Sequence, residues 1–125
     1  IVKDEPDRIR EALAAAAAAG AQAIVVNGGT GITRRDRTYE TVTTLLEKRI
    51  DGFGELFRML SFAEIGSAAM LSRAVAGSWG GRAVSSVPGP TPAVRLAWAR
   101  LIAPEIAHVV FELARHAPES ARRGG

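Results

Sequence analysis

The residues best suited to chemistry lie in one glycine-rich segment, Asn27-Gly28-Gly29-Thr30-Gly31. Because this segment carries one hydroxyl and no bulky side chain, its backbone N–H groups can approach an anion closely. Its glycine spacing differs from the dinucleotide-binding fingerprint, and no Lys-Ser or Lys-Thr pair follows to form a Walker A loop. By itself the segment is as consistent with a tight turn after a strand as with an anion-binding loop.

A charged segment, Arg34-Arg35-Asp36-Arg37-Thr38, follows the glycines directly. One carboxylate among three arginines suits a metal or substrate contact that is flanked by anion-binding groups. Capping of the next helix by Asp36 explains the same residues equally well. Asp4 precedes Pro6 and a predicted helix, and its position alone favours interaction with the helix dipole.

A second unusual loop is Pro88-Gly89-Pro90-Thr91-Pro92. Thr91 and Pro92 form an N-cap and first-position pair, which places a hydroxyl at a helix N-terminus, where anions bind. Three further polar residues, Ser67, Ser72 and Arg73, carry weaker signals, because polar residues are ordinary at strand edges.

Hydrophobic periodicity and turn residues indicate an alternation of helices and strands. We expect helices over 6–19, from 38 to before 51, over 53–60, from 61, over 91–102 and from 104, and strands over 23–26, 69–76 and 83–87. The apolar run 23–26 is typical of a strand buried on both faces. This alternation predicts a three-layer α/β/α sandwich with a mostly parallel sheet. Both unusual loops follow strands, so we expect them at the carboxyl edge of the sheet, where such folds bind ligands.

Composition limits the class of protein. The chain has 125 residues, no cysteine and a net charge of +3, which predicts one domain over 1–116 with a flexible tail over 117–125, without disulfides or thiolate metal sites. Fourteen of the sixteen basic residues are arginines, which favours phosphate-bearing ligands slightly. The arginines are scattered and aromatic residues make up 6%, so we expect no nucleic-acid partner. No apolar run approaches the roughly 20 residues that span a bilayer, so we expect no membrane partner.

Residues 27–38 resemble the glycine-rich signature of molybdenum-cofactor biosynthesis proteins of the MoaB/MogA family. The resemblance continues through 52–58 and 66–73, and then through Pro88-Gly89 followed by a helix. Four motifs in the same order are far more specific than any one of them, and the bacterial MoaB branch is the most similar.

The resemblance implies a molybdopterin-binding fold that forms a homotrimer or hexamer in the cytoplasm, with other proteins of the pathway as further partners. Active relatives adenylylate molybdopterin with Mg-ATP, and their two required aspartates align with Asp4 and Asp36, which become the catalytic and Mg²⁺-holding candidates. For the oligomer interface we expect apolar surface on 53–60 and the turn at Trp79. The ligand-binding candidates are Gly28, Gly29, Thr30, Gly31, Ser67, Ser72, Arg73, Pro88, Gly89 and Thr91.

A non-catalytic protein that binds or assembles the pterin on the same fold is the alternative to an adenylyltransferase. The chain departs from the family pattern at Asn27, where threonine is usual, and at Pro90-Thr91, where Ser or Asn is commoner. The family also begins with a strand, a helix and another ligand loop before the region that matches Ile1. We therefore expect the N-terminal β-α unit to be absent from this sequence.

Overall fold

A mixed four-stranded sheet forms the centre of the protein. The computed structural model describes residues 6–30, 32–34, 36–88, 95 and 97–115. The strands are, in sheet order, β1 (Ala23–Asn27), β4 (Arg82–Val87), β3 (Val75–Trp79) and β2 (Lys48–Arg49). β1 is parallel to β4, whereas β3 pairs antiparallel with both β4 and β2.

The prediction of a mostly parallel sheet is therefore wrong. β3 and β4 are joined by Gly80 and Gly81, whose φ angles are 56° and 76°. Two successive residues with positive φ make the tight turn of a hairpin, which forces the strands on either side to run antiparallel. The turn is shorter than the gap between the predicted strands 69–76 and 83–87, because Gly77 to Trp79 belong to β3.

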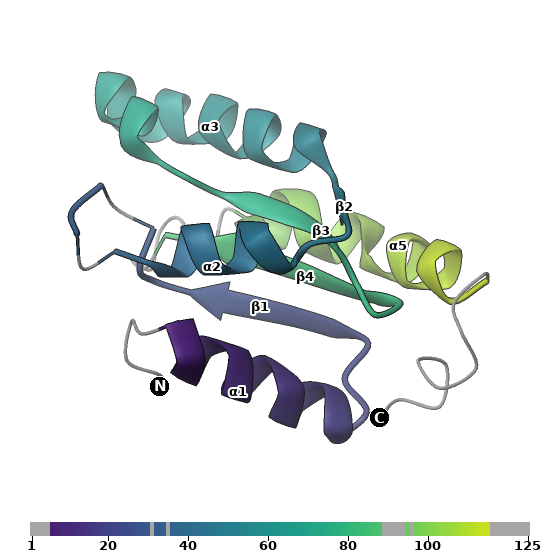
Figure 1. Ribbon diagram of the computed structural model, residues 1–125. Helices are drawn as coiled ribbons and strands as arrows, with labels where there is room; N and C mark the ends of the chain where they lie inside the picture. The colour runs from purple at the N-terminus through teal and green to yellow at the C-terminus, as the bar shows by residue number, and fades with distance from the viewer. Residues whose placement is uncertain (1–5, 31, 35, 89–94, 96, 116–125) are drawn as a thin grey trace.

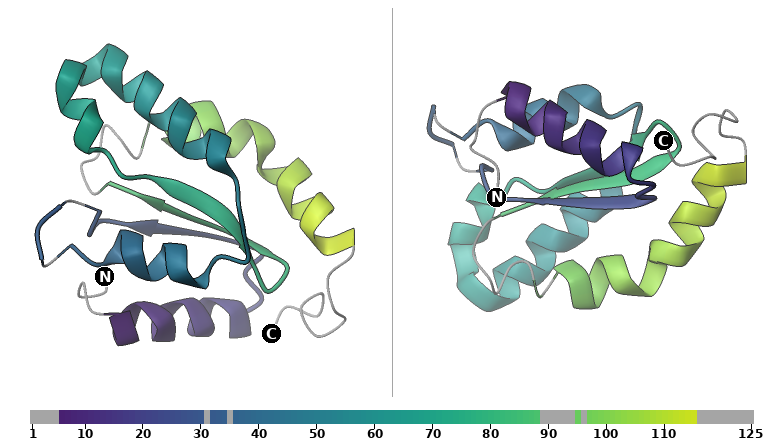
Figure 2. Two further views of the ribbon diagram at one scale, coloured as in Figure 1. Left: turned by 45° about the horizontal axis from the view of Figure 1, so that its top comes forward. Right: turned by 90° about the horizontal axis from the view of Figure 1, so that it is seen from below.

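Helices cover both faces of this sheet (Figure 1). α1 (Pro6–Ala18) and α2 (Thr38–Leu45) lie on one face, and α3 (Asp51–Ile65) and α5 (Ala103–Arg115) lie on the other (Figure 2). Each face has its own apolar core. The core under α1 and α2 contains Ile9, Leu13, Val42, Val75 and Val84. The core under α3 and α5 contains Phe53, Phe57, Ala74, Ala76, Val87, Ala97 and Ile102.

Several element boundaries differ from those predicted. α3 continues through the predicted helix start at Ser61, because that side chain is 4% exposed and faces the interior instead of capping a helix. Residues predicted to begin a strand at 69 belong to a 3₁₀ helix, η1 (Gly66–Leu71). The helix expected over 91–102 ends in a π-helical turn, η2 (Trp98–Ile102), and its first residues lie outside the described part of the chain.

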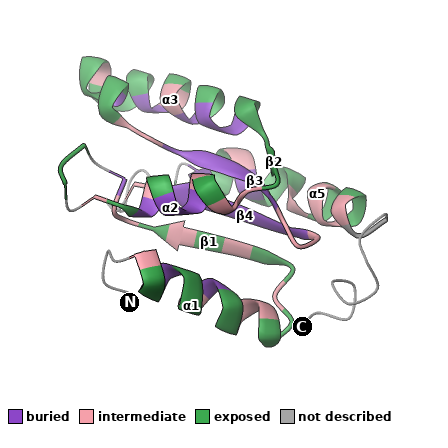
Figure 3. Ribbon diagram, viewed as in Figure 1, coloured by how far each residue is buried: buried purple, intermediate pink, exposed green. Residues whose placement is uncertain are grey.

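β1 occupies an edge of the sheet, although its sequence predicted burial on both faces. Exposed and half-buried residues alternate along β1, and Val25 is 40% exposed (Figure 3). An edge strand is covered less completely than a central one, which explains this difference. Within the described residues, no helix is both long and apolar enough to cross a membrane.

Close packing of α3 against the sheet requires glycine at position 54. A Cβ atom built on Gly54 would lie 2.7 Å from the Ala74 carbonyl oxygen, whereas one built on Gly52, in the same helical turn, would contact nothing within 4 Å. We predict that Gly54→Ala lowers the free energy of unfolding by about 1–3 kcal/mol, because α3 must move away from β3.

The matched control is Gly52→Ala, which should leave stability unchanged or raise it by up to about 1 kcal/mol through helix propensity. Urea unfolding of the two variants beside the parent protein measures both effects. Equal effects of the two substitutions would contradict the packing argument.

Candidate functional site

The glycine-rich loop leaves the carboxyl end of β1 beside the end of β4. The Gly28 N–H donates to the Val87 carbonyl oxygen at 3.0 Å, and the φ angles of Gly28 and Gly29 are 100° and 65°. The Gly29 carbonyl oxygen accepts the N–H groups of Thr38 at 3.0 Å and Tyr39 at 3.4 Å. The loop thus satisfies the N–H groups of Thr38 and Tyr39 at the start of α2.

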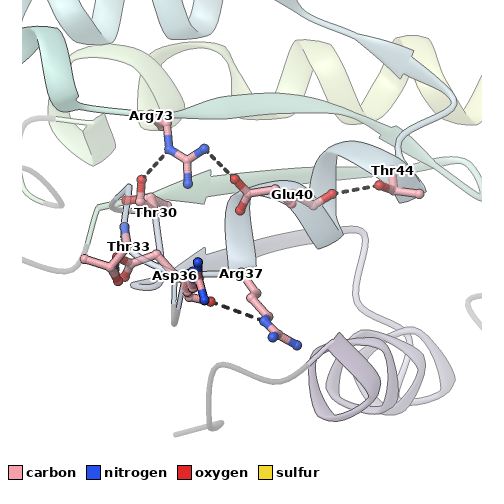
Figure 4. Close-up of polar contacts among 8 residues, drawn as sticks. Thr30, Thr33, Asp36, Arg37, Glu40, Thr44 and Arg73 are labelled. Atoms are coloured by element: carbon pink, nitrogen blue, oxygen red, sulfur yellow. Dashed lines mark hydrogen bonds and ion pairs between the residues drawn. The ribbon is translucent and has the colours of Figure 1, made fainter.

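Arg73 holds the same loop from the other side (Figure 4). Its Nε donates to the Thr30 carbonyl oxygen at 2.8 Å, and its Nη1 lies 2.5 Å from Glu40 Oε2. The guanidinium also lies over the Tyr39 ring, 4.7 Å from the ring centre, in a cation–π contact. Arg73 therefore connects the loop, α2 and the segment that leads into β3.

These contacts fix the orientation of the loop peptides. The Gly29 carbonyl is directed at Thr38 and Tyr39, so the Thr30 N–H of the same planar peptide points away from them. Among the described hydrogen bonds, neither this N–H nor that of Gly29 has an internal acceptor. Successive free N–H groups next to residues of positive φ form a concave anion receptor. The arrangement can therefore bind a phosphate oxygen through the backbone.

Asp36 lies in the same loop, half-buried, and one of its oxygens is already engaged. Asp36 Oδ2 accepts the Thr33 N–H at 3.0 Å and the Thr33 hydroxyl at 2.5 Å. The described residues contain no group of three or more His, Asp or Glu side chains placed to hold a metal ion. One carboxylate fits an Mg²⁺ ion that arrives with nucleotide phosphates, because Mg²⁺ is usually bound by one or two carboxylates plus substrate phosphates.

The structure brings together some of the predicted site residues. Gly28 to Thr30, Asp36 and Arg73 share the loop cluster, and Pro88 follows Val87 next to Gly28. Ser72 directly precedes Arg73, whereas Ser67 is exposed on η1 and shows no contact with the loop in the described structure. Four predicted residues lie outside the described part of the chain: Asp4, Gly31, Gly89 and Thr91.

A cavity of about 360 Å³ adjoins this cluster between α1 and β1. Its lining combines apolar residues of α1 and β1 with two polar residues from the ends of the loop, Asn27 and Thr38. Another cavity, of about 410 Å³, lies under α5 on the opposite face, and no residue of the loop lines it. We therefore place the candidate site at the smaller, more polar cavity.

Sequence reasoning missed Tyr39 and Glu40. Their signal is weak, because both look like ordinary first-turn residues of α2 and their partner Arg73 is 33 residues from Glu40 in sequence. The hydrogen bond from Arg73 lowers the pKa of the Glu40 carboxyl below its usual value of 4.5.

Comparison with known proteins decides the family. Residues 1–108 match the family model described as "Probable molybdopterin binding domain". The molybdenum cofactor biosynthesis protein B of Bacillus cereus is 54% identical over 117 residues, a match that covers 92% of this chain and 69% of that protein. The chain belongs to the MoaB/MogA family. The protein of the same name from Bacillus subtilis is 53% identical over 115 residues, covering 90% of this chain and 68% of that one.

Solved structures of the MoaB/MogA family share the fold. A crystal structure of a molybdenum cofactor biosynthesis protein B has a TM-score of 0.84 at 52% identity, covering 93% of this chain and 73% of that one. The tungsten cofactor synthesizing protein MoaB from Pyrococcus furiosus has a TM-score of 0.83 at 38% identity, with coverages of 88% and 70%. The family predicted from the sequence motifs is thus confirmed.

We predict a pH-dependent stability that reports on the Arg73–Glu40 pair. Because the Glu40 pKa is lower in the folded than in the unfolded chain, its contribution is complete at pH values above 4.5 and is lost as the pH falls through the folded value. Urea unfolding over this acid range should show a smaller loss of stability for Glu40→Gln than for the parent protein. Identical acid profiles of the two proteins would contradict the pairing.

Proposed function

We propose that this protein binds molybdopterin at the glycine-rich loop and adenylylates it with Mg-ATP. Family membership supports the pterin as ligand. The observation that carries the proposal is the pair of loop N–H groups, of Gly29 and Thr30, that have no internal acceptor in the described structure. Such donors neutralise phosphate charge without side-chain reorganisation, which is what phosphoryl transfer needs from a protein.

In the proposed step, an oxygen of the pterin's terminal phosphate attacks the α-phosphorus of ATP. A new P–O bond forms, the bond between the α-phosphorus and the bridging oxygen breaks, and pyrophosphate leaves with the electron pair of that bond. The protein contributes mainly positioning and charge neutralisation. The loop N–H groups would hold phosphate oxygens, and Arg73 holds the loop in position at the Thr30 carbonyl.

Asp36 is the residue that we assign to the Mg²⁺ of the nucleotide, with Asp4 as its expected partner from the family resemblance. The ion would supply charge neutralisation on the phosphates. The hydrogen bonds from Thr33 hold the Asp36 carboxylate within the loop. An Mg²⁺ ion held there would lie near the phosphates that the loop N–H groups bind.

The test is incubation of the protein with molybdopterin and Mg-ATP while pyrophosphate release is measured. We predict release by the parent protein, and a loss of at least about 100-fold for Asp36→Asn, a size typical of a lost charge-stabilising group, with pterin binding largely retained. Glu105→Gln, an exposed carboxylate-to-amide change on α5, is the control and should release pyrophosphate at the parent rate. Pterin binding without any pyrophosphate release by the parent protein would establish the non-catalytic alternative.

A homo-oligomer is part of the proposal, and α3 with η1 supplies its interface. Six apolar side chains on these two helices are between 46% and 79% exposed: Leu56, Met59, Phe62, Ile65, Met70 and Leu71. Several large apolar side chains exposed on two adjoining helices favour a protein contact there. Trp79, the other expected interface residue, is half-buried and packs against the core under α1 and α2.

Sedimentation velocity tests the interface. We predict that the parent protein sediments as an oligomer and that Phe62→Glu shifts it towards the monomer, because a buried unpaired carboxylate opposes association. Phe111→Glu, at an equally exposed phenylalanine on α5, should leave the oligomer intact. A parent protein that remains monomeric would rule the proposed assembly out.

A further inference from the structure

We propose that the cavity at Arg58 is a second phosphate-binding subsite on the same edge of the sheet. This cavity, of about 180 Å³, lies between the start of α3, the start of β3 and the side of α2. The charged side chains that line it are Arg49, Asp51, Glu55 and Arg58. The rest of the lining comes from the phenol of Tyr39 and from Ile50, Gly54, Ala74 and Val75. It is therefore distinct from both the cavity beside the glycine-rich loop and the apolar cavity under α5.

Gly54 makes room for the Arg58 side chain in this cavity. A Cβ atom on Gly54 would lie 3.0 Å from Nη1 and 3.2 Å from Nη2 of Arg58, so the guanidinium folds back over the preceding helical turn. The two residues are four apart on α3 and therefore lie on one side of the helix. Their spacing explains the segment Gly52-Phe53-Gly54-Glu55-Leu56-Phe57-Arg58, a motif of the sequence to which the adenylylation step gives no role.

Arg58 has no hydrogen-bond or ion-pair partner among the described residues. Arg58 is half-buried, so some of its five N–H donors lose hydration, and a partner is expected for them in the functional state. The neighbouring charges do not supply that partner. Asp51 is paired with Arg49 at 3.7 Å, and Glu55, although one turn away on α3, is exposed and makes no ion pair with Arg58.

A tetrahedral oxyanion is the ligand that fits this group best. A guanidinium presents two parallel N–H donors to two phosphate oxygens, a geometry that a single water molecule does not reproduce. With Asp51 offset by Arg49, the Arg58 charge and the exposed Glu55 carboxylate remain, so the oxyanion must bind on the Arg58 side of the cavity. Glu55 limits the affinity, which suits a subsite for one group of a larger ligand.

The position of the cavity connects it to the glycine-rich loop. Tyr39 forms part of its wall, donates its N–H to the Gly29 carbonyl oxygen, and carries the Arg73 guanidinium over its ring. Val75 pairs with Ser86 near the carboxyl end of β4, so the cavity opens on the edge of the sheet where β1 and β4 end. The assignment to this reaction rests on the proposed function, because both substrates of that step carry phosphate groups. Phosphate binding at Arg58 does not depend on the proposed function.

The test uses inorganic phosphate and the ¹⁵N-labelled full chain, with the Arg58 side-chain Nε–H resonance as the reporter. We expect this resonance to move saturably with phosphate. In a thermal unfolding series, the increase of Tm with phosphate should be smaller for Arg58→Gln, while its Tm without phosphate equals or exceeds that of the parent protein. A merely structural arginine would instead lower the phosphate-free Tm when it is replaced.

Arg10→Gln is the matched control, because it removes one arginine charge from the exposed side of α1, away from the cavity. It should retain the parent response to phosphate. An unmoved Arg58 resonance, or an Arg58→Gln variant with the full phosphate response, would overturn the subsite.

Competition then assigns the phosphate to its source. Displacement of phosphate from Arg58 by ATP alone assigns the subsite to the nucleotide, and displacement by molybdopterin alone assigns it to the pterin. If neither compound displaces phosphate from Arg58, the subsite has no place in the proposed reaction. Phosphate binding at Arg58 without pyrophosphate release from the substrates would contradict the proposed function and leave the subsite standing.

Discussion

The hydrogen bond from Arg73 to the Thr30 carbonyl oxygen is the interaction on which the candidate site depends. A glycine-rich loop has many conformations available, and a loop free to rotate its peptides has no fixed anion receptor. Arg73 reaches it from the segment before β3, and Glu40 and Tyr39 hold the guanidinium in place from α2. The loop is therefore preorganised by residues that belong to two other elements.

Two arginines secure opposite ends of the β3–β4 hairpin by binding carbonyl groups. Arg82, which is 8% exposed, donates to the carbonyl oxygens of Ala21, Gly80 and Ala17, and so fastens the hairpin turn to the end of α1. Arg73 does the same for the glycine-rich loop at the other end. Arg58 lies at that second end as well, but its guanidinium has no such carbonyl in the described structure. This contrast separates arginines that hold the fold from one available to a ligand.

Local signals in the sequence were sufficient for most elements and for placing the glycine-rich loop at the end of β1. The stripe from Ile9 to Ala17 predicts α1, and the apolar run before Asn27 predicts β1 with its loop at the carboxyl end. The prediction of a mostly parallel sheet was wrong because the segment between the predicted strands 69–76 and 83–87 contains a two-residue hairpin turn. Gly80-Gly81 alone forms a hairpin turn, which makes β3 and β4 antiparallel.

Contacts between distant segments could not be predicted in this way. Nothing local in Arg73 specifies Glu40 or Thr30, which are 33 and 43 residues away, and β2 is only two residues long. Ser61 showed a capping-box spacing, but burial against the sheet outweighed that local preference. Packing in three dimensions decides these features, and the family signature conveys the site without explaining how it is held.

The central claim is that phosphate oxygens of molybdopterin bind the N–H groups of the loop that Arg73 holds in position. Titration of the ¹⁵N-labelled protein with molybdopterin, followed through the backbone amide resonances, tests it most directly. The account predicts saturable downfield shifts of the Gly29 and Thr30 amide protons, which weaken in Arg73→Lys because a lysine cannot hold Thr30 and Glu40 together. Pterin binding that leaves both amides unmoved would contradict it.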